Sequence, residues 1–287
     1  MGQKISAGVK DMMIASVFFA LMNLLVKFVP HIPSYEIVFF RCVITLVISL
    51  SYLRKHGIPI FGTNKKYLIL RGVFGISALT MYFTSLQNLP LANAVVLQYL
   101  SPIFTTIIAI WFLQEKVTPI QWLFFGISFI GVGVIKGFDS GMEPLYFMLG
   151  LSAALLSGFA YNCVRKVKDT DHPMVVVFYF PLIGLPVTGL ISSFNWVMPV
   201  GWDWLTLLGI GVFTQIAQVR MTKALQASKI ALVSSVRYLG VIYAIVFGVI
   251  FFDEIPSVYT FTGIGLVLTG VLFNIFYKKG IIKFARS

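Results

Sequence analysis

Residues 92–113 read ANAVVLQYLSPIFTTIIAIWFL, an apolar run that is long enough to cross a lipid bilayer. A membrane-spanning helix needs roughly 20 largely apolar residues. A transmembrane strand would instead show about 10 residues of alternating polarity, whereas Ile103 to Leu113 is apolar on all sides. A helix also satisfies its own backbone hydrogen bonds, which lipid cannot do. The stretch therefore predicts a transmembrane helix.

Similar runs recur along the whole chain, separated by short polar or Pro- and Gly-containing segments. Of the 287 residues, 58% are hydrophobic and only 11% are charged, and the mean hydropathy is +0.91. A soluble protein of this length could not bury so much apolar surface in its core. We therefore predict an all-α integral membrane protein with ten transmembrane helices, near residues 11–29, 35–53, 67–86, 92–113, 119–136, 145–164, 174–194, 204–222, 230–251 and 257–277.

The first of these runs follows Lys4 and Lys10, so it resembles a secretory signal. No small-residue cleavage site follows it, and the run continues through Asn23 and Lys27. We therefore expect it to be the first transmembrane helix of the protein.

The net charge of +12 is distributed unevenly along the chain. With the amino terminus placed in the cytoplasm, the basic residues outside the cytoplasmic tails and loops are Lys27, Lys136, Arg41, Arg220 and Arg237. All others, including Arg71, are assigned to the cytoplasmic side. The positive-inside rule predicts such an asymmetry for an even number of spans. We expect a multi-pass protein of the bacterial inner membrane with both termini in the cytoplasm, in contact with lipids and not with nucleic acid.

The chain also repeats itself at a constant shift of 139 residues, the separation between Asn23 and Asn162. The other pairs in this register are Lys27 and Lys166, Phe39 and Phe178, Gly72-Val73-Phe74 and Gly211-Val212-Phe213, Leu86-Gln87 and Leu225-Gln226, Tyr99-Leu100 and Tyr238-Leu239, Glu115 and Glu254, Gly126 and Gly265, and Gly131 and Gly270. A single ungapped register over so much of the chain indicates a duplication.

Each copy holds five predicted spans, so the second copy must enter the membrane upside down relative to the first. We place the first repeat at residues 1–138 and the second, inverted repeat at residues 139–287. Inverted repeats are the recurrent construction of secondary transporters, because two similar halves can exchange conformations and open a cavity to either side in turn. The alternative is that the duplication only built a stable membrane bundle.

One pattern occurs in both repeats: residues 97–104 (LQYLSPIF) run on to Gln114-Glu115-Lys116, and residues 237–240 (RYLG) run on to residues 252–256 (FDEIP). In this pattern the chain resembles the drug/metabolite transporter superfamily, and most closely its EamA-type ten-helix transporters. Val241 stands in the second copy where the first has the Pro. The resemblance implies a central cavity between the first four helices of each repeat, with the fifth and tenth helices at the periphery. It also implies transport of metabolites such as amino acids, organic acids, nucleotide-like compounds or drugs.

Polar side chains inside the spans are candidate contacts for a solute, because a polar group at bilayer depth is costly unless it faces protein or a watery cavity. Two equivalent stripes carry them: Gln98, Ser101 and Thr105 at 92–113, and Ser234, Arg237 and Tyr238 at 230–251. Gln98 and Arg237 are equivalent at the shift of 139. We therefore expect both near the pseudo-symmetry axis at the membrane midplane, as the centre of the binding site.

Further candidate residues are Gln215 and Gln218 in the span 204–222, Asn23 and Asn162 on the first helix of each repeat, and the tyrosines Tyr82, Tyr99, Tyr161 and Tyr238. The glutamines either line the cavity or form interhelical hydrogen bonds that hold the bundle. The asparagines either line the cavity or tie the first helix to its neighbours. Because the first-repeat equivalents of the glutamines are apolar, we expect the polar side of the cavity in the second repeat.

Arg41 has two interpretations, since it lies five residues after Glu36. It could neutralise that carboxylate or draw an anion toward the cavity. We favour the structural role.

All ten Asp and Glu residues map to loops or span ends, so no carboxylate in mid-membrane is left to relay protons or bind sodium. A buried arginine without a buried acid favours a solute that brings its own negative group. We therefore predict a secondary transporter that moves an anionic or zwitterionic metabolite, such as an amino acid or organic acid, by alternating access. The alternatives are a multidrug or nucleotide-like metabolite exporter of the same fold, and a channel or non-transporting sensor.

The sequence shows no His cluster, phosphate-binding Gly-Lys loop or acid pair within the spans. We predict neither catalytic residues nor a metal or cofactor, and hence no enzyme. A monomer is compatible with this organisation.

Overall fold

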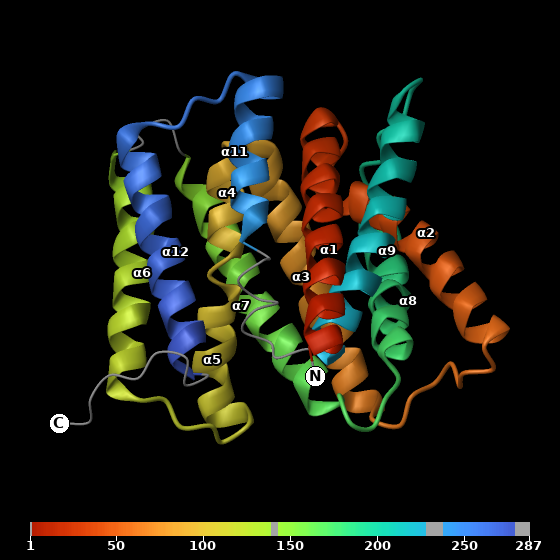
Figure 1. Ribbon diagram of the computed structural model, residues 1–287. Coiled ribbons are helices and arrows are strands. Elements are labelled where there is room, and N and C mark those ends of the chain that lie inside the picture. The colour runs from red at the N-terminus through yellow and green to blue at the C-terminus, as the bar shows by residue number, and fades with distance from the viewer. Residues whose placement is uncertain (1, 139–142, 228–237, 279–287) are drawn as a thin grey trace.

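The computed structural model describes residues 2–138, 143–227 and 238–278. This part of the chain is a bundle of helices and contains no strand (Figure 1). The helices are α1 (Gly2–Phe28), α2 (Ser34–Lys55), α3 (Lys65–Asn88), α4 (Leu91–Gln98), α5 (Ser101–Phe112), α6 (Pro119–Phe138), α7 (Pro144–Lys166), α8 (Pro173–Ser192), α9 (Asp203–Ala227), α11 (Leu239–Phe252) and α12 (Val258–Lys278).

The helices follow the predicted spans closely. In the described chain, eight segments are long and apolar enough to cross a membrane, with α4 and α5 counted as one, and α11 is a shorter apolar helix. α9 occupies the span predicted at 204–222. The prediction of an all-α membrane protein with ten helices in two repeats is confirmed. The start of the span predicted at 230–251 lies outside the described residues.

The span predicted at 92–113 is two helices and not one. α4 ends at Gln98 and α5 begins at Ser101, with Tyr99 and Leu100 in a turn between them. Pro102 explains the interruption, because it has no N–H to donate to the carbonyl of Gln98 one turn earlier. In the second repeat, α11 begins directly after Tyr238, the equivalent of Tyr99, and residues 228–237 lie outside the described chain.

The duplication is visible as contacts that occur twice. Gly72 on α3 lies against Ile183 on α8, and Gly211 on α9 lies against Ile44 on α2. A shift of 139 residues converts the first contact into the second. Figure 1 shows that α1 and α7, the first helices of the two repeats, run in opposite directions along the bundle. The repeats are therefore inverted relative to each other.

α6 and α12, the last helices of the two repeats, pack together on one side of the bundle (Figure 1). Their glycines lie against the partner helix where a Cβ would not fit: Gly131 against Gly263 and Val267, and Gly270 against Phe124 and Ser128. These two contacts are also related by the shift of 139. Small residues let membrane helices approach closely. The peripheral position that the family resemblance implied for these helices is confirmed.

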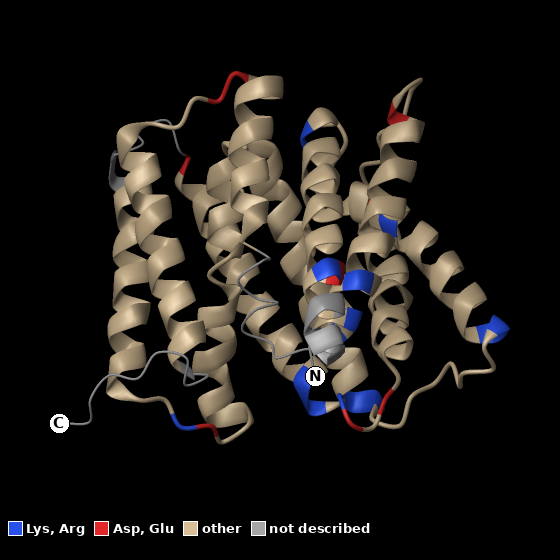
Figure 2. Ribbon diagram, in the orientation of Figure 1, with Lys and Arg blue, Asp and Glu red and all other residues tan. Residues whose placement is uncertain are grey.

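The charges are distributed as Figure 2 shows, with most basic segments of the described chain toward the end of the bundle at which α1 begins. Arg71 does not belong to these exposed basic segments. It lies in α3, six residues after Lys65, and only 6% of its surface is exposed. The prediction that Arg71 belongs to a cytoplasmic loop is therefore wrong. A long side chain near a helix end can either reach the headgroups or turn inward, and that of Arg71 turns inward.

Candidate functional site

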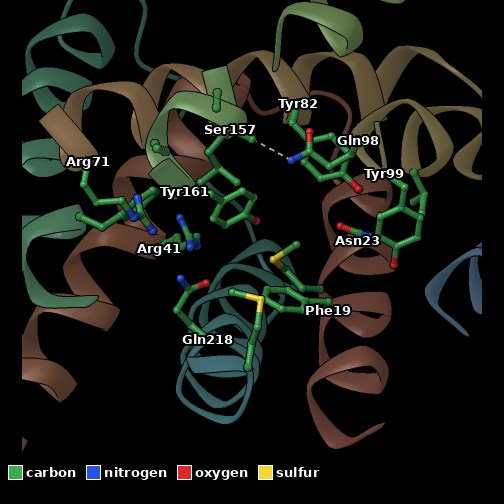
Figure 3. Close-up of a pocket in the computed structure, with 18 residues that line it drawn as sticks. Phe19, Asn23, Arg41, Arg71, Tyr82, Gln98, Tyr99, Ser157, Tyr161 and Gln218 are labelled. Carbon is green, nitrogen blue, oxygen red and sulfur yellow. Dashed lines mark hydrogen bonds between the residues drawn. The ribbon is translucent and has the colours of Figure 1, made fainter. Parts of the chain in front are cut away.

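A cavity of about 120 Å³ lies in the middle of the bundle. Its walls come from α1, α2, α3, α4, α7, α8 and α9, and the peripheral pair α6 and α12 contributes none of the described lining residues (Figure 3). One water molecule needs roughly 10–15 Å³ by the same measure. The cavity can therefore hold several waters or a small organic solute.

Two arginines form one end of this cavity. Arg41 on α2 and Arg71 on α3 are 5% and 6% exposed, and both lie on the ring of Phe180 from α8. Their Cζ atoms are 4.5 and 5.0 Å from the ring centroid. Nε and Nη1 of Arg41 and Nε of Arg71 are buried without a hydrogen-bond partner in the described chain. Figure 3 shows the two guanidinium groups side by side, next to Tyr161 and Gln218.

Neither guanidinium is paired with an acid of the described chain. The ion pairs of that part are Lys27 with Glu254, His31 with Asp203, Arg165 with Glu115, Lys168 with Asp169 and Arg220 with Asp11. Glu36 forms no ion pair with Arg41 in this part of the chain: its Oε2 accepts a hydrogen bond of 3.0 Å from the backbone N–H of Val197, and its Oε1 is buried without a hydrogen-bond partner there. The structural interpretation of Arg41 as the partner of Glu36 is therefore wrong.

The opposite end of the cavity is polar but uncharged. Asn23 on α1 and Tyr99 after α4 lie there, with Gln98 and Tyr82 nearby (Figure 3). Gln98 donates a hydrogen bond of 2.9 Å to Oγ of Ser157 on α7. The cavity thus offers a cationic end and an end with amide and hydroxyl groups.

The internal symmetry places both ends of the cavity near the middle of the membrane. Residues at equivalent positions of two repeats can touch each other only near the axis that relates the repeats. Arg41 and Phe180 are equivalent at the shift of 139 and are in contact. Tyr99 and Tyr238 are also equivalent, and their ring centroids are 5.1 Å apart. Because such an axis lies in the membrane plane, the cavity extends along it at mid-depth.

The family of the chain follows from a comparison with known protein families. The model of the EamA-like transporter family matches residues 7–136 and again residues 144–276. The chain belongs to the EamA-like transporter family. This confirms the resemblance to drug/metabolite transporters that the sequence pattern suggested, and it confirms the two repeats.

Several transporters are similar to this EamA-like chain over most of their length. The pseudopaline exporter CntI of Pseudomonas aeruginosa is 29% identical over 279 residues, which cover 96% of this chain and 98% of the exporter. Solute carrier family 35 member G1 of Homo sapiens is 31% identical over 269 residues, with 88% and 74% covered. An S-adenosylmethionine uptake transporter of Rickettsia felis is 25% identical over 254 residues, with 87% and 85% covered.

A solved crystal structure of a protein also shares the fold, with a TM-score of 0.70 and 16% sequence identity. The match covers 97% of this chain and 100% of that chain. The helix arrangement of this EamA-like protein therefore exists in a protein of quite different sequence.

The structure brings six of the predicted site residues together around the cavity: Asn23, Tyr82, Gln98, Tyr99, Tyr161 and Gln218. Their role in binding stays a prediction. Two others, Ser234 and the proposed central residue Arg237, lie outside the described residues.

The remaining predicted residues lie beside the cavity and do not line it. Asn162 donates hydrogen bonds to the carbonyls of Thr105 and Gly158, so it joins α7 to α5. Ser101 is fully buried, and the Thr105 hydroxyl donates to the Ser101 carbonyl. The ring of Tyr238 packs on Tyr99, as described above.

Gln215 is also placed beside the cavity, where it donates a hydrogen bond of 3.0 Å to Oγ of Ser49 and joins α9 to α2. It borders a second cavity of about 10 Å³, next to Arg41. That volume is about enough for one water molecule.

Sequence reasoning missed Arg71 at the cationic end of the site and kept Arg41 as an anion-binding residue only as the less favoured of two interpretations. It expected the polar side of the cavity in the second repeat, but both charged side chains among the described lining residues, Arg41 and Arg71, come from the first. The sequence contained one indication of this end of the site: both arginines fall within predicted spans, where a charged side chain is costly unless it faces protein or a watery cavity. Phe180 gave no signal of its own among so many aromatic residues.

The described residues contain no group of three or more His, Cys, Asp or Glu side chains that could hold a metal ion. The polar groups that the described lining offers to a solute are two guanidinium groups, the amides of Asn23, Gln98 and Gln218, tyrosine hydroxyls and the hydroxyl of Ser157. Guanidinium groups bind carboxylates and phosphates through paired N–H donors.

Proposed function

We propose that this chain is a secondary transporter that carries a small organic anion or zwitterion, such as an amino acid or a related organic acid, through its central cavity. The observation that carries the proposal is the buried pair Arg41 and Arg71, which lines the cavity without an acidic partner in the described chain. Leaving a buried charge unpaired costs several kcal/mol. A solute with a negative group offsets that cost when it binds.

Alternating access is the mechanism that the architecture supports. Two inverted repeats enclose one cavity at mid-membrane, and an exchange of conformations between the repeats would open it to one side and then to the other. Relatives of the chain include both an exporter and an uptake transporter by name. Carriers of this construction can work in either direction along a gradient.

The same proposal covers the placement of the chain. We place both termini in the cytoplasm and the protein in a bacterial inner membrane, because most basic segments gather at one end of the bundle (Figure 2). We propose that the first repeat ends at residue 138 and that the second begins at residue 139. Since one chain supplies all the described walls of the cavity, a monomer is sufficient to form the site.

A counterflow assay in liposomes tests the proposal. Vesicles containing the purified chain are loaded with one unlabelled amino acid or organic acid, and uptake of the same labelled compound is followed. We expect at least one acid to show uptake that saturates and is stimulated by the internal load. Flux that does not saturate would indicate a channel, and a response only to cationic or uncharged drugs would favour the multidrug exporter.

The double variant Arg41→Gln and Arg71→Gln connects the activity to the site. We expect it to lose counterflow of the acid, because no cation remains at that end of the cavity. The matched control is Arg54→Gln, which removes the same charge from an exposed position in the last turn of α2. Full counterflow in the double variant would overturn the proposal.

A further inference from the structure

Two buried cations lie at one end of the cavity, and their number indicates how many negative charges the solute carries. Arg41 and Arg71 share a single aromatic ring, that of Phe180. A cation–π contact stabilises a cation by less than the free energy that burying an unpaired charge costs. The ring therefore does not replace an anion for either guanidinium group.

The two cations are close enough for one small solute to reach both. Their Cζ atoms lie 4.5 and 5.0 Å from the same ring centroid, so they are at most 9.5 Å apart, the sum of these two distances. Each guanidinium has at least one buried nitrogen without a partner in the described chain, and both line the same cavity. A single molecule with two neighbouring acidic groups can contact both.

Among the described lining residues, the other end of the cavity carries no charge. The polar side chains described there are those of Asn23, Gln98, Tyr99 and Tyr82 (Figure 3), and the neighbouring lining residues, such as Phe19 and Met22, are apolar. A solute with one acidic group at each end would therefore leave one guanidinium unpaired and bury one carboxylate among uncharged groups. Because both charged residues of the described lining lie at the arginine end, we place both negative charges of the solute there.

We propose that the Arg41–Arg71 end of the cavity binds a dianionic head group, either two carboxylates separated by a short carbon chain or one phosphate-type group. The proposal rests on the proposed function, since it names the substrate class of the same site. A solute with a single negative charge can hydrogen-bond to both guanidinium groups but compensates only one of their two positive charges. Hydrogen bonds to charged groups contribute enough for a preference of roughly 10- to 100-fold for the dianion.

A charge series of probes on the unmodified protein tests the proposal. Succinate, succinamate and succinamide have similar size and carry two, one and no negative charges at mildly alkaline pH. Methyl phosphate carries two charges on one group. Affinities are measured by isothermal titration of the purified chain in detergent. We expect succinate or methyl phosphate, or both, to bind about 10- to 100-fold more tightly than succinamate, and succinamide not to bind.

The two dianions separate the two possible head groups. Tighter binding of succinate indicates a dicarboxylate, and tighter binding of methyl phosphate indicates a phosphate ester. Equal affinities for succinate and succinamate would overturn the proposal of a dianion but would leave an anion carrier in place. If none of the four probes binds while counterflow of an acid persists, the proposal of a dianion fails alone; if counterflow also fails with every acid, the proposed function fails as well.

Single variants provide a second measurement. In Arg71→Gln one guanidinium remains, so we expect the preference of succinate over succinamate to fall to about onefold. Arg54→Gln is the control and should keep the preference of the unmodified chain. A preference that persists undiminished in Arg71→Gln would contradict the shared binding of two charges. The probe series on the unmodified protein decides the matter even if a variant does not fold.

Discussion

At the scale of single residues, one equivalence between the repeats accounts for the cationic end of the site. Arg41 and Phe180 occupy the same position in the two repeats and meet at the axis between them. In two identical repeats, the same residue type would occupy both positions and face its copy across the axis. In this chain the two positions hold a cation and an aromatic ring. Because the two residues differ, the charge at this point belongs to the first repeat alone, and the site is asymmetric within a symmetric frame.

Because Gly75 has no side chain, it leaves room for the guanidinium group of Arg71. A Cβ at this position would collide with Nη1 of Arg71 and lie 3.0 Å from the ring of Phe180. In Gly75→Ala we expect the guanidinium to be displaced and the affinity for an acidic solute to fall about tenfold, as measured by isothermal titration. Helix propensity favours Ala over Gly by up to about 1 kcal/mol, so the thermal stability should not fall in parallel.

The control for this substitution is Gly133→Ala on α6, where an added Cβ meets no atom within 4 Å. It should leave the affinity unchanged. An affinity that is also unchanged in Gly75→Ala would show that the position of the Arg71 guanidinium does not matter for binding.

At the scale of helices, the two repeats fasten the ends of their equivalent helices α5 and α11 in the same way. α5 and α11 both end near a residue with positive φ, Gln114 at 55° and Asp253 at 53°. The next residue in each case is a glutamate that pairs with a basic side chain near the end of the other repeat's first helix, Glu115 with Arg165 and Glu254 with Lys27. These ion pairs join the two repeats.

The pair at Glu254 is the more deeply embedded, so its removal should cost more stability. Its carboxylate accepts from Lys27 and from the first N–H of α4, that of Leu91, at 2.7 Å. The side chains of Lys27 and Glu254 are 10% and 21% exposed, against 38% and 28% for Arg165 and Glu115. We expect Glu254→Gln to lower the free energy of unfolding by roughly 2 kcal/mol, and Glu115→Gln by no more than about 1 kcal/mol.

Thermal unfolding of the two single variants in the same detergent measures this difference. A larger loss in Glu115→Gln would contradict the argument from burial. Leu91→Ala is not a suitable control because it removes packing, but Asp169→Asn is, since its carboxylate is exposed and lies 3.9 Å from Lys168.

At the scale of the whole molecule, the sequence predicted the fold better than the site. Ten apolar runs and an ungapped duplication determine the number of helices and their inversion, because lipid leaves few other solutions for such a chain. The faces that the helices turn inward were harder to predict. Lipid-facing and core-facing residues are both apolar in a membrane helix, so periodicity carries little information about rotation.

The missed residues show this limit directly. Arg71 lies near a helix end, where outward and inward orientations are equally compatible with its position in the sequence. Gln98 and Asn23 were found because an amide in mid-span has few alternatives to an inward position. Asn162 and Gln215 met the same criterion, but the structure places them in hydrogen bonds between helices. Sequence alone does not separate these two uses of an amide.

The inverted architecture makes a prediction about which loops face which side. Val200, between α8 and α9, is 73% exposed and lies at the end opposite to that at which α1 begins, whereas Asp169, between α7 and α8, lies in a loop at the basic end. Because basic loops stay in the cytoplasm, we expect Val200→Cys to react with a membrane-impermeant maleimide added to whole cells. Asp169→Cys should react only after the membrane is opened. Background labelling should be low, since the native Cys42 and Cys163 are both buried. Labelling in the reverse order would place the termini outside the cell and would invert the orientation assigned to the carrier.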